Sequence, residues 1–163
     1  MKSSVKKGKQ SAIDGFAHEH MVVGILMKKY HNVFFSDNPL SPYDIIIVRK
    51  LGKKENIIRA QVKTAKKSVS FTGGTRGGVD RTYKSGIKTY TQSQKTSDVV
   101  IGFNPISSDK YELYFVPTIL IEKWKTKSKS ITVLYQLKNN FEILEHCKDK
   151  KIILKKAKEY KLP

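Results

Sequence analysis

Residues 44–64 read DIIIVRKLGKKENIIRAQVKT. After the opening Asp44, the first apolar run is hydrophobic on both faces, which is typical of a central strand in a sheet. Residues 51–56 predict a turn, and residues 57–64 return as a second strand. The stretch therefore predicts a β-hairpin that lies inside a sheet and begins at an acidic residue.

The returning strand divides its side chains between two environments. Alternation along a strand sends three apolar side chains toward a core, namely Ile58, Ala60 and Val62. The opposite face then holds Arg59, Gln61 and Lys63. Because a central strand seldom has such a polar face unless that face lines a cleft, we expect a functional cleft on this side of the sheet.

A long helix is predicted before the hairpin. Ser11 is a plausible N-cap with Asp14 three residues later, so the helix is expected to run over residues 12–30. Its apolar face recurs at helical spacing and comprises Phe16, Val23, Leu26 and Tyr30. Glu19 falls on the same face, where an acid either lies at the edge of the apolar stripe or points into a polar site.

The remaining pattern predicts a mixed architecture. Further strands are expected at residues 33–36, 98–103, 111–116 and 131–136, with helices over 117–124 and from 141 onward. The lysine-rich tail is amphipathic. This order of elements indicates an α/β (α+β) fold in which a central mixed sheet is flanked by helices.

The chain divides into an arm and one domain. Residues 1–10 carry four lysines and no acid, so they are interpreted as a mobile basic arm. Residues 11–163 suit a single domain with one core. Within it, residues 66–97 are long for a loop in a compact domain, and loops of this length tend to be functional or disordered.

Charge indicates the class of partner. Lys and Arg total 32 against 14 Asp and Glu, which gives a net charge of +18. Self-repulsion of this size is offset by a polyanion, most commonly nucleic acid. An anionic membrane surface and a lysine-rich composition are the alternatives. No apolar run is long enough to span a membrane.

The basic loop supplies candidate contacts to double-stranded DNA. They are Lys66, Lys67, Arg76, Arg81, Lys84 and Lys88. The two arginines could read guanine edges through bidentate hydrogen bonds or contact phosphates alone. The absence of a signal-peptide pattern and the lone Cys147 favour a reducing compartment, so we expect a cytoplasmic protein.

The hairpin can assemble a hydrolytic site. Pairing of its strands can bring Asp44 near Gln61 and Lys63. The Asp44 carboxylate, the Gln61 amide and the Val62 backbone carbonyl are hard oxygen ligands that suit Mg²⁺. A bound metal polarises a phosphoryl oxygen and lowers the pKa of its water, and a neighbouring lysine can orient that water or stabilise the negative transition state. These are parts for phosphodiester hydrolysis.

These residues resemble the PD-(D/E)XK nuclease superfamily. The resemblance rests on Glu19, on Ser-Pro-Tyr-Asp at residues 41–44, and on Gln-Val-Lys-Thr-Ala at residues 61–65. The strands expected at 98–103 and 113–117 also look like those that follow in the family. Within the superfamily, the chain most resembles group I intron-associated homing endonucleases with a Gln-x-Lys motif. Tyr43 interrupts the usual proline–aspartate pair, and a glutamine stands where the second acid is usual.

The resemblance implies a restriction-endonuclease-like fold and Mg²⁺-dependent cleavage of duplex DNA, usually by a homodimer. Mn²⁺ can substitute in such sites. It also implies that Asp44 and Gln61 bind the metal, that Lys63 is the catalytic lysine, and that Glu19 is an accessory acid which contacts the metal directly or through water. Three alternatives stay open: a Holliday junction resolvase, a restriction enzyme, and a non-catalytic basic DNA-binding protein.

Overall fold

The core of the protein is a five-stranded mixed sheet. The computed structural model describes residues 2–38, 40–74 and 89–163. The sheet has the order β1-β2-β3-β7-β8, with β3 and β7 parallel and the other pairs antiparallel. The strands span Val33–Phe35 (β1), Ile45–Leu51 (β2), Lys54–Thr64 (β3), Val99–Pro105 (β7) and Tyr111–Pro117 (β8).

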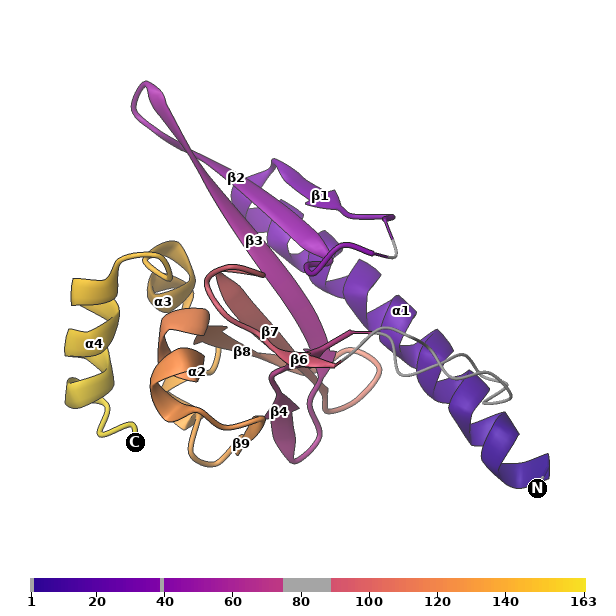
Figure 1. The fold of residues 1–163 in the computed structure, drawn as a ribbon. Coiled ribbons are helices and arrows are strands. Elements are labelled where there is room, and N and C mark those ends of the chain that lie inside the picture. Colours follow the sequence, from indigo (N-terminus) through magenta and orange to yellow (C-terminus); the bar gives the residue numbers. More distant parts are fainter. Residues whose placement is uncertain (1, 39, 75–88) are drawn as a thin grey trace.

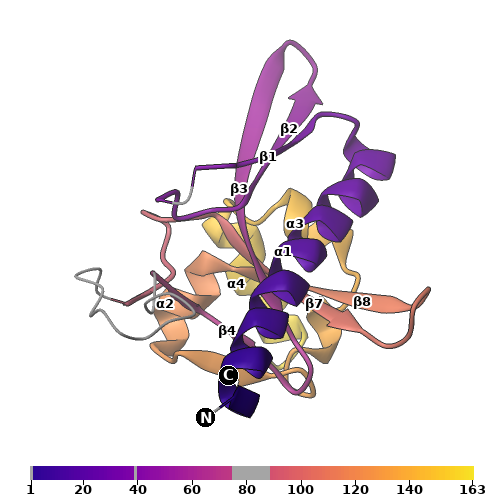
Figure 2. The same cartoon turned by 90° about the vertical axis from the view of Figure 1, so that its right-hand side faces the viewer.

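Helices cover both faces of this sheet. Figures 1 and 2 show α1 on one face and the smaller helices on the other. The helices are α1 (Lys2–Tyr30), α2 (Thr118–Trp124), α3 (Phe141–Glu145), α4 (Lys150–Glu159) and a short 3₁₀ helix, η1 (Tyr135–Leu137). The arrangement confirms the predicted α/β (α+β) class. Within the described residues, no helix is long and apolar enough to cross a membrane.

The β2–β3 hairpin follows the sequence pattern. Ile45 lies opposite Ala60 and Ile47 opposite Ile58, and all four residues are fully buried. The turn is tighter than predicted, because β2 ends at Leu51 and β3 begins at Lys54. Gly52 adopts φ 63°, a left-handed conformation that glycine adopts at no steric cost. The outer half of the hairpin projects beyond the other strands (Figure 1).

Two small sheets lie in and beside the segment predicted as a long loop. β4 (Ser68–Ser70) pairs with β9 (Ser128–Ser130), and β5 (Thr72–Gly73) pairs with β6 (Tyr90–Thr91). The segment predicted as a long basic loop over residues 66–97 therefore contains short strands near both of its ends. Backbone hydrogen bonds in these short ladders hold each end of the segment.

The predicted arm is also helical. α1 begins at Lys2, not after Ser11, and the Asp14 carboxylate accepts a hydrogen bond from Gln10 Nε2 at 2.8 Å instead of forming a capping box. The four lysines and one glutamine of residues 2–10 favour a helix, which continues through Gly8 despite the low helix propensity of glycine. Residues 7–14 are exposed, and this end of α1 extends past the sheet (Figure 1).

The strand predicted at residues 131–136 is not formed. Residues 131–134 are a turn that leads into η1. Leu134 and Leu137 are buried, whereas Val133 and Tyr135 are 41% and 62% exposed. Ile, Thr, Val and Tyr favour a strand here. The segment instead forms a helical turn, because this buries the two leucines, which are three positions apart.

Candidate active site

Asp44 lies where β2 begins, at the edge of β3. Its backbone N–H donates to the Ala60 carbonyl at 2.9 Å. Its side-chain Oδ2 accepts two hydrogen bonds of 2.7 Å, from the Val62 backbone N–H and from Gln61 Nε2. The Asp44 carboxylate therefore accepts the Val62 N–H in place of a backbone carbonyl of a neighbouring strand. It also lies against Gln61, as the hairpin prediction required.

Glu19 joins this site from α1. The side chain is half-buried, and burial followed by the nearby Asp44 carboxylate raises the pKa of Glu19 to about 7. Lys63 opposes this shift. Burial also raises the pKa of Asp44, while the Val62 N–H, Lys63 and Gln61 lower it. Two carboxyl groups and the lysine thus share one electrostatic environment, with Glu19 on the helix and the other two on the hairpin.

The oxygen atoms around Asp44 suit a hard divalent cation. In an extended strand, the N–H and C=O of one residue point to the same edge, so the Val62 carbonyl faces the Asp44 side of β3. Within the part of the chain described, no group of three or more His, Cys, Asp or Glu side chains could hold a metal. A cation here would be held by two carboxylates, with the Val62 carbonyl oxygen and water as further ligands. Mg²⁺ accepts such a set because it keeps several of its waters.

Burial of the two carboxyl groups supports that fit, with repulsion from Asp44 as a second cause at Glu19. The raised pKa values of Glu19 and Asp44 mean that the folded protein disfavours both negative charges in the absence of a positive one. A divalent cation between them would remove this penalty. The oxygen ligands and the raised pKa values of the two carboxyl groups therefore both favour a divalent cation.

Gln61 is buried beside Asp44, with 8% of its surface exposed. Its Nε2 donates to Asp44, and its Oε1 accepts a hydrogen bond of 2.6 Å from Gln92 Nε2. The amide therefore turns its NH₂ group, rather than its oxygen, toward Asp44. Gln92 was not singled out by the sequence, because a glutamine among polar residues has no pattern that marks it.

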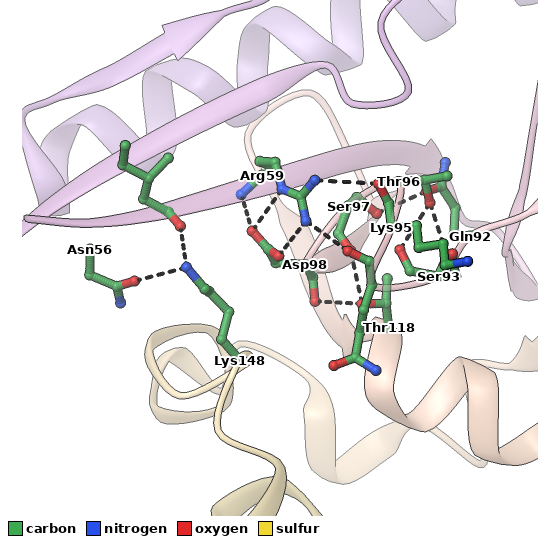
Figure 3. Close-up of polar contacts among 12 residues, drawn as sticks. Asn56, Arg59, Gln92, Ser93, Lys95, Thr96, Ser97, Asp98, Thr118 and Lys148 are labelled. Carbon is green, nitrogen blue, oxygen red and sulfur yellow. Dashed lines mark hydrogen bonds and ion pairs between the residues drawn. The ribbon is translucent and has the colours of Figure 1, made fainter.

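Arg59 belongs to a different cluster. The guanidinium donates to the Asp98 carboxylate at 2.8 Å and 3.3 Å, and the Arg59 backbone N–H donates to the same group at 2.8 Å. The Arg59 guanidinium also donates to the Gln94 carbonyl at 2.8 Å. Figure 3 shows this ion pair between β3 and the start of β7. Arg59 thus fixes the segment that carries Gln92, and its role is structural.

Two of the predicted DNA contacts lie within the described residues. Lys66 and Lys67 are exposed just beyond the end of β3. Arg76, Arg81, Lys84 and Lys88 lie outside the described residues.

The fold has a counterpart among solved structures. No family model matches the sequence, and no curated protein matches it. The bacterial homing endonuclease I-Ssp6803I has a similar structure, with a TM-score of 0.53 and 13% sequence identity, over 73% of this chain and 76% of that chain. At this identity the likeness concerns the fold. The chain therefore has a fold that a homing endonuclease also uses.

Proposed function

We propose that the protein is a Mg²⁺-dependent endonuclease that cleaves double-stranded DNA at specific sites. The observation that carries the proposal is the convergence of Glu19, Asp44, Gln61 and Lys63 from α1 and the hairpin on one half-buried site. The similar fold of a bacterial homing endonuclease and the net charge of +18 support it. The charge suits a phosphate-rich partner.

Each residue has a distinct role in this proposal. Asp44 and Glu19 hold the cation, with the Val62 carbonyl as a further ligand. Gln61 completes the site beside Asp44. Lys63 stabilises the negative charge that develops on the phosphate, because a fixed cation in a half-buried site acts more strongly than one in water. When bound, Mg²⁺ supplies Lewis-acid polarisation of the phosphodiester and a more acidic water.

Cleavage of DNA with and without metal tests the proposal. Because a site-specific enzyme needs its target, the substrate should include high-complexity genomic DNA as well as plasmid. We expect fragments of fixed length in Mg²⁺ and none in EDTA, and loss of cutting in Asp44→Asn and Lys63→Met. DNA binding should persist in both variants.

The exposed Asp109→Asn and Lys110→Ala variants, on the β7–β8 turn, are the matched controls and should cut normally. Four-way junctions should be assayed in parallel. Cleavage confined to junctions would replace a site-specific role with junction resolution. Binding without cutting of any substrate would contradict the enzyme and leave a basic DNA-binding protein.

A further inference from the structure

Gln92 is a fully engaged buried amide next to the candidate site. It is 1% exposed. Its Nε2 donates to the Pro42 carbonyl at 3.2 Å and to Gln61 Oε1 at 2.6 Å. Its Oε1 accepts from the hydroxyl groups of Thr96 at 2.6 Å and Ser97 at 2.9 Å (Figure 3). All four hydrogen-bonding positions of the amide are therefore used.

The Pro42 carbonyl determines which way this amide lies. A backbone carbonyl can only accept, so the nitrogen of Gln92 must face it. The same nitrogen then faces Gln61, so the Gln61 atom opposite must be its oxygen. The NH₂ group of Gln61 is left to face Asp44. One backbone carbonyl thus fixes two side-chain amides in series.

Reversal of the Gln61 amide would be costly. It would place two NH₂ groups against each other between Gln61 and Gln92. If Gln92 turned as well, its oxygen would face the Pro42 carbonyl. Either arrangement leaves a buried polar atom without a partner, at about 1–3 kcal/mol.

We infer that Gln92 is a positioning residue that keeps Gln61 as a hydrogen-bond donor to Asp44, also when a cation is bound. Gln61 then orients Asp44 and does not turn its oxygen toward the metal. Both side-chain hydrogen bonds to Asp44 described above use Oδ2, so Oδ1 would be the Asp44 oxygen that could bind a cation. This inference rests on the proposed function for its catalytic consequence, but the orientation of the amides can be tested without it.

Nuclear magnetic resonance of the ¹⁵N-labelled protein reads the orientation directly. The Gln61 side-chain NH₂ and the Val62 backbone N–H donate to the same oxygen, so their protons should give a cross-peak. We expect it in the wild type without metal and with saturating Mg²⁺. Loss of the wild-type cross-peak on addition of Mg²⁺, or its absence from the start, would overturn the inference.

Gln92→Met tests the role of Gln92, because methionine fills similar space without a donor. In this variant the Gln61 amide keeps its hydrogen bond to Asp44 but loses the one from Gln92. The hydrogens of the Gln61 NH₂ group should therefore exchange with water faster than in the wild type, and their cross-peak to Val62 should weaken in Mg²⁺. Gln94→Met is the matched control, since this exposed glutamine of the same segment donates to Glu122 instead. Unchanged exchange in Gln92→Met would contradict the inference. If that variant does not fold, Ser97→Ala, which removes one partner of Gln92, should give a smaller increase in exchange.

Cleavage then tests the consequence for the site. Loss of an outer partner of a metal site typically lowers metal affinity or activity by about 10–100-fold. We expect a loss of this size in Gln92→Met, with DNA binding in EDTA unchanged. A wild type that neither responds to Mg²⁺ nor cuts DNA would contradict the proposed function. A wild type that cuts, with a Gln92→Met variant that cuts equally well at the same Mg²⁺ concentration, would contradict the positioning role alone.

Discussion

At the scale of residues, the site places two partly buried carboxyl groups beside one lysine that favours their charged forms. Glu19 and Asp44 both have raised pKa values, and Lys63 opposes both shifts. Burial of unpaired charge lowers stability, so a protein keeps such an arrangement at functional sites more often than elsewhere. Burial of these charges leads to two predictions at this scale.

The first concerns stability and pH. The folded pKa of Glu19 is about 7, against an ordinary value of 4.5, so the folded state binds this proton more tightly than the unfolded state does. The free energy of unfolding of the metal-free protein should therefore fall as pH rises from about 4.5 to 7. Thermal unfolding in EDTA across this range measures it. Glu19→Gln should flatten the decrease, whereas Glu55→Gln, at an exposed hairpin position, should leave it as it is.

The second concerns Gln61→Glu. Gln61 Nε2 lies 2.7 Å from Asp44 Oδ2, so a carboxylate at position 61 would place two acceptors in contact. We expect the metal-free variant to unfold at a lower temperature than the wild type. Saturating Mg²⁺ should raise its unfolding temperature by more than it raises that of the wild type, because the added charge is neutralised. An equal Mg²⁺ response in both proteins would contradict the arrangement described here.

The sequence predicted Glu19 and the hairpin residues of this site and missed Gln92. Asp44, Gln61 and Lys63 lie on one hairpin, so strand alternation and turn position were sufficient to bring them together. The position of Gln92 depends on the Phe71 carbonyl, which accepts its backbone N–H, and on the Arg59–Asp98 ion pair nearby. Tertiary contacts of this kind leave no periodic signal in the sequence.

At the scale of elements, a glycine allows β4 to pack over the central sheet. A Cβ atom built on Gly102 of β7 would lie 2.5 Å from Cγ2 of the buried Val69 of β4. Val69 has little freedom to move away, because its side chain is short, β-branched and fully buried. The close approach therefore requires glycine.

Gly102→Ala should lower the free energy of unfolding by about 1–3 kcal/mol, the usual cost of overpacking. Gly24→Ala is its control. Gly24 lies inside α1 with no atom within 4 Å of an added Cβ, so alanine there should stabilise the helix by about 0.5–1 kcal/mol. Denaturant unfolding of the two variants gives the comparison. A neutral Gly102→Ala would mean that β4 does not pack closely on β7.

Elements were predicted best where burial and propensity agree. β7 and β8 contain long apolar runs and were placed to within two residues at each end. The start of α1 and the region 131–136 were wrong for opposite reasons. The first is helical without a clear apolar pattern, and the second has high β-propensity but buries residues at helical spacing.

At the scale of the whole molecule, the net charge of +18 predicts an affinity for DNA that depends on salt. Each phosphate contact releases condensed counterions, so binding in EDTA should weaken steeply with salt. For 6–10 contacts the loss is roughly 10³–10⁵-fold between 50 and 200 mM salt. Fluorescence anisotropy with a labelled duplex measures the slope. Removal of Lys66 or Lys67 should lower that slope by about 1 each, whereas an affinity that is insensitive to salt would exclude this mode of binding.

Double-strand cleavage should require two chains. One site of this kind cuts one strand, so a concerted double-strand cut needs a homodimer with two-fold symmetry. We expect sedimentation velocity to find a dimer at the concentrations that linearise DNA, and nicked product to accumulate below them. A protein that stays monomeric while it makes concerted double-strand cuts would rule this out.

The most direct test of the account is the binding of a divalent cation by Glu19 and Asp44. Electron paramagnetic resonance of Mn²⁺ measures it, with and without duplex DNA. We predict one Mn²⁺ per chain that Mg²⁺ displaces, with weaker binding in both Glu19→Gln and Asp44→Asn. Wild-type protein that binds no Mn²⁺ even with DNA present, or variants that bind it as tightly as the wild type, would contradict the site.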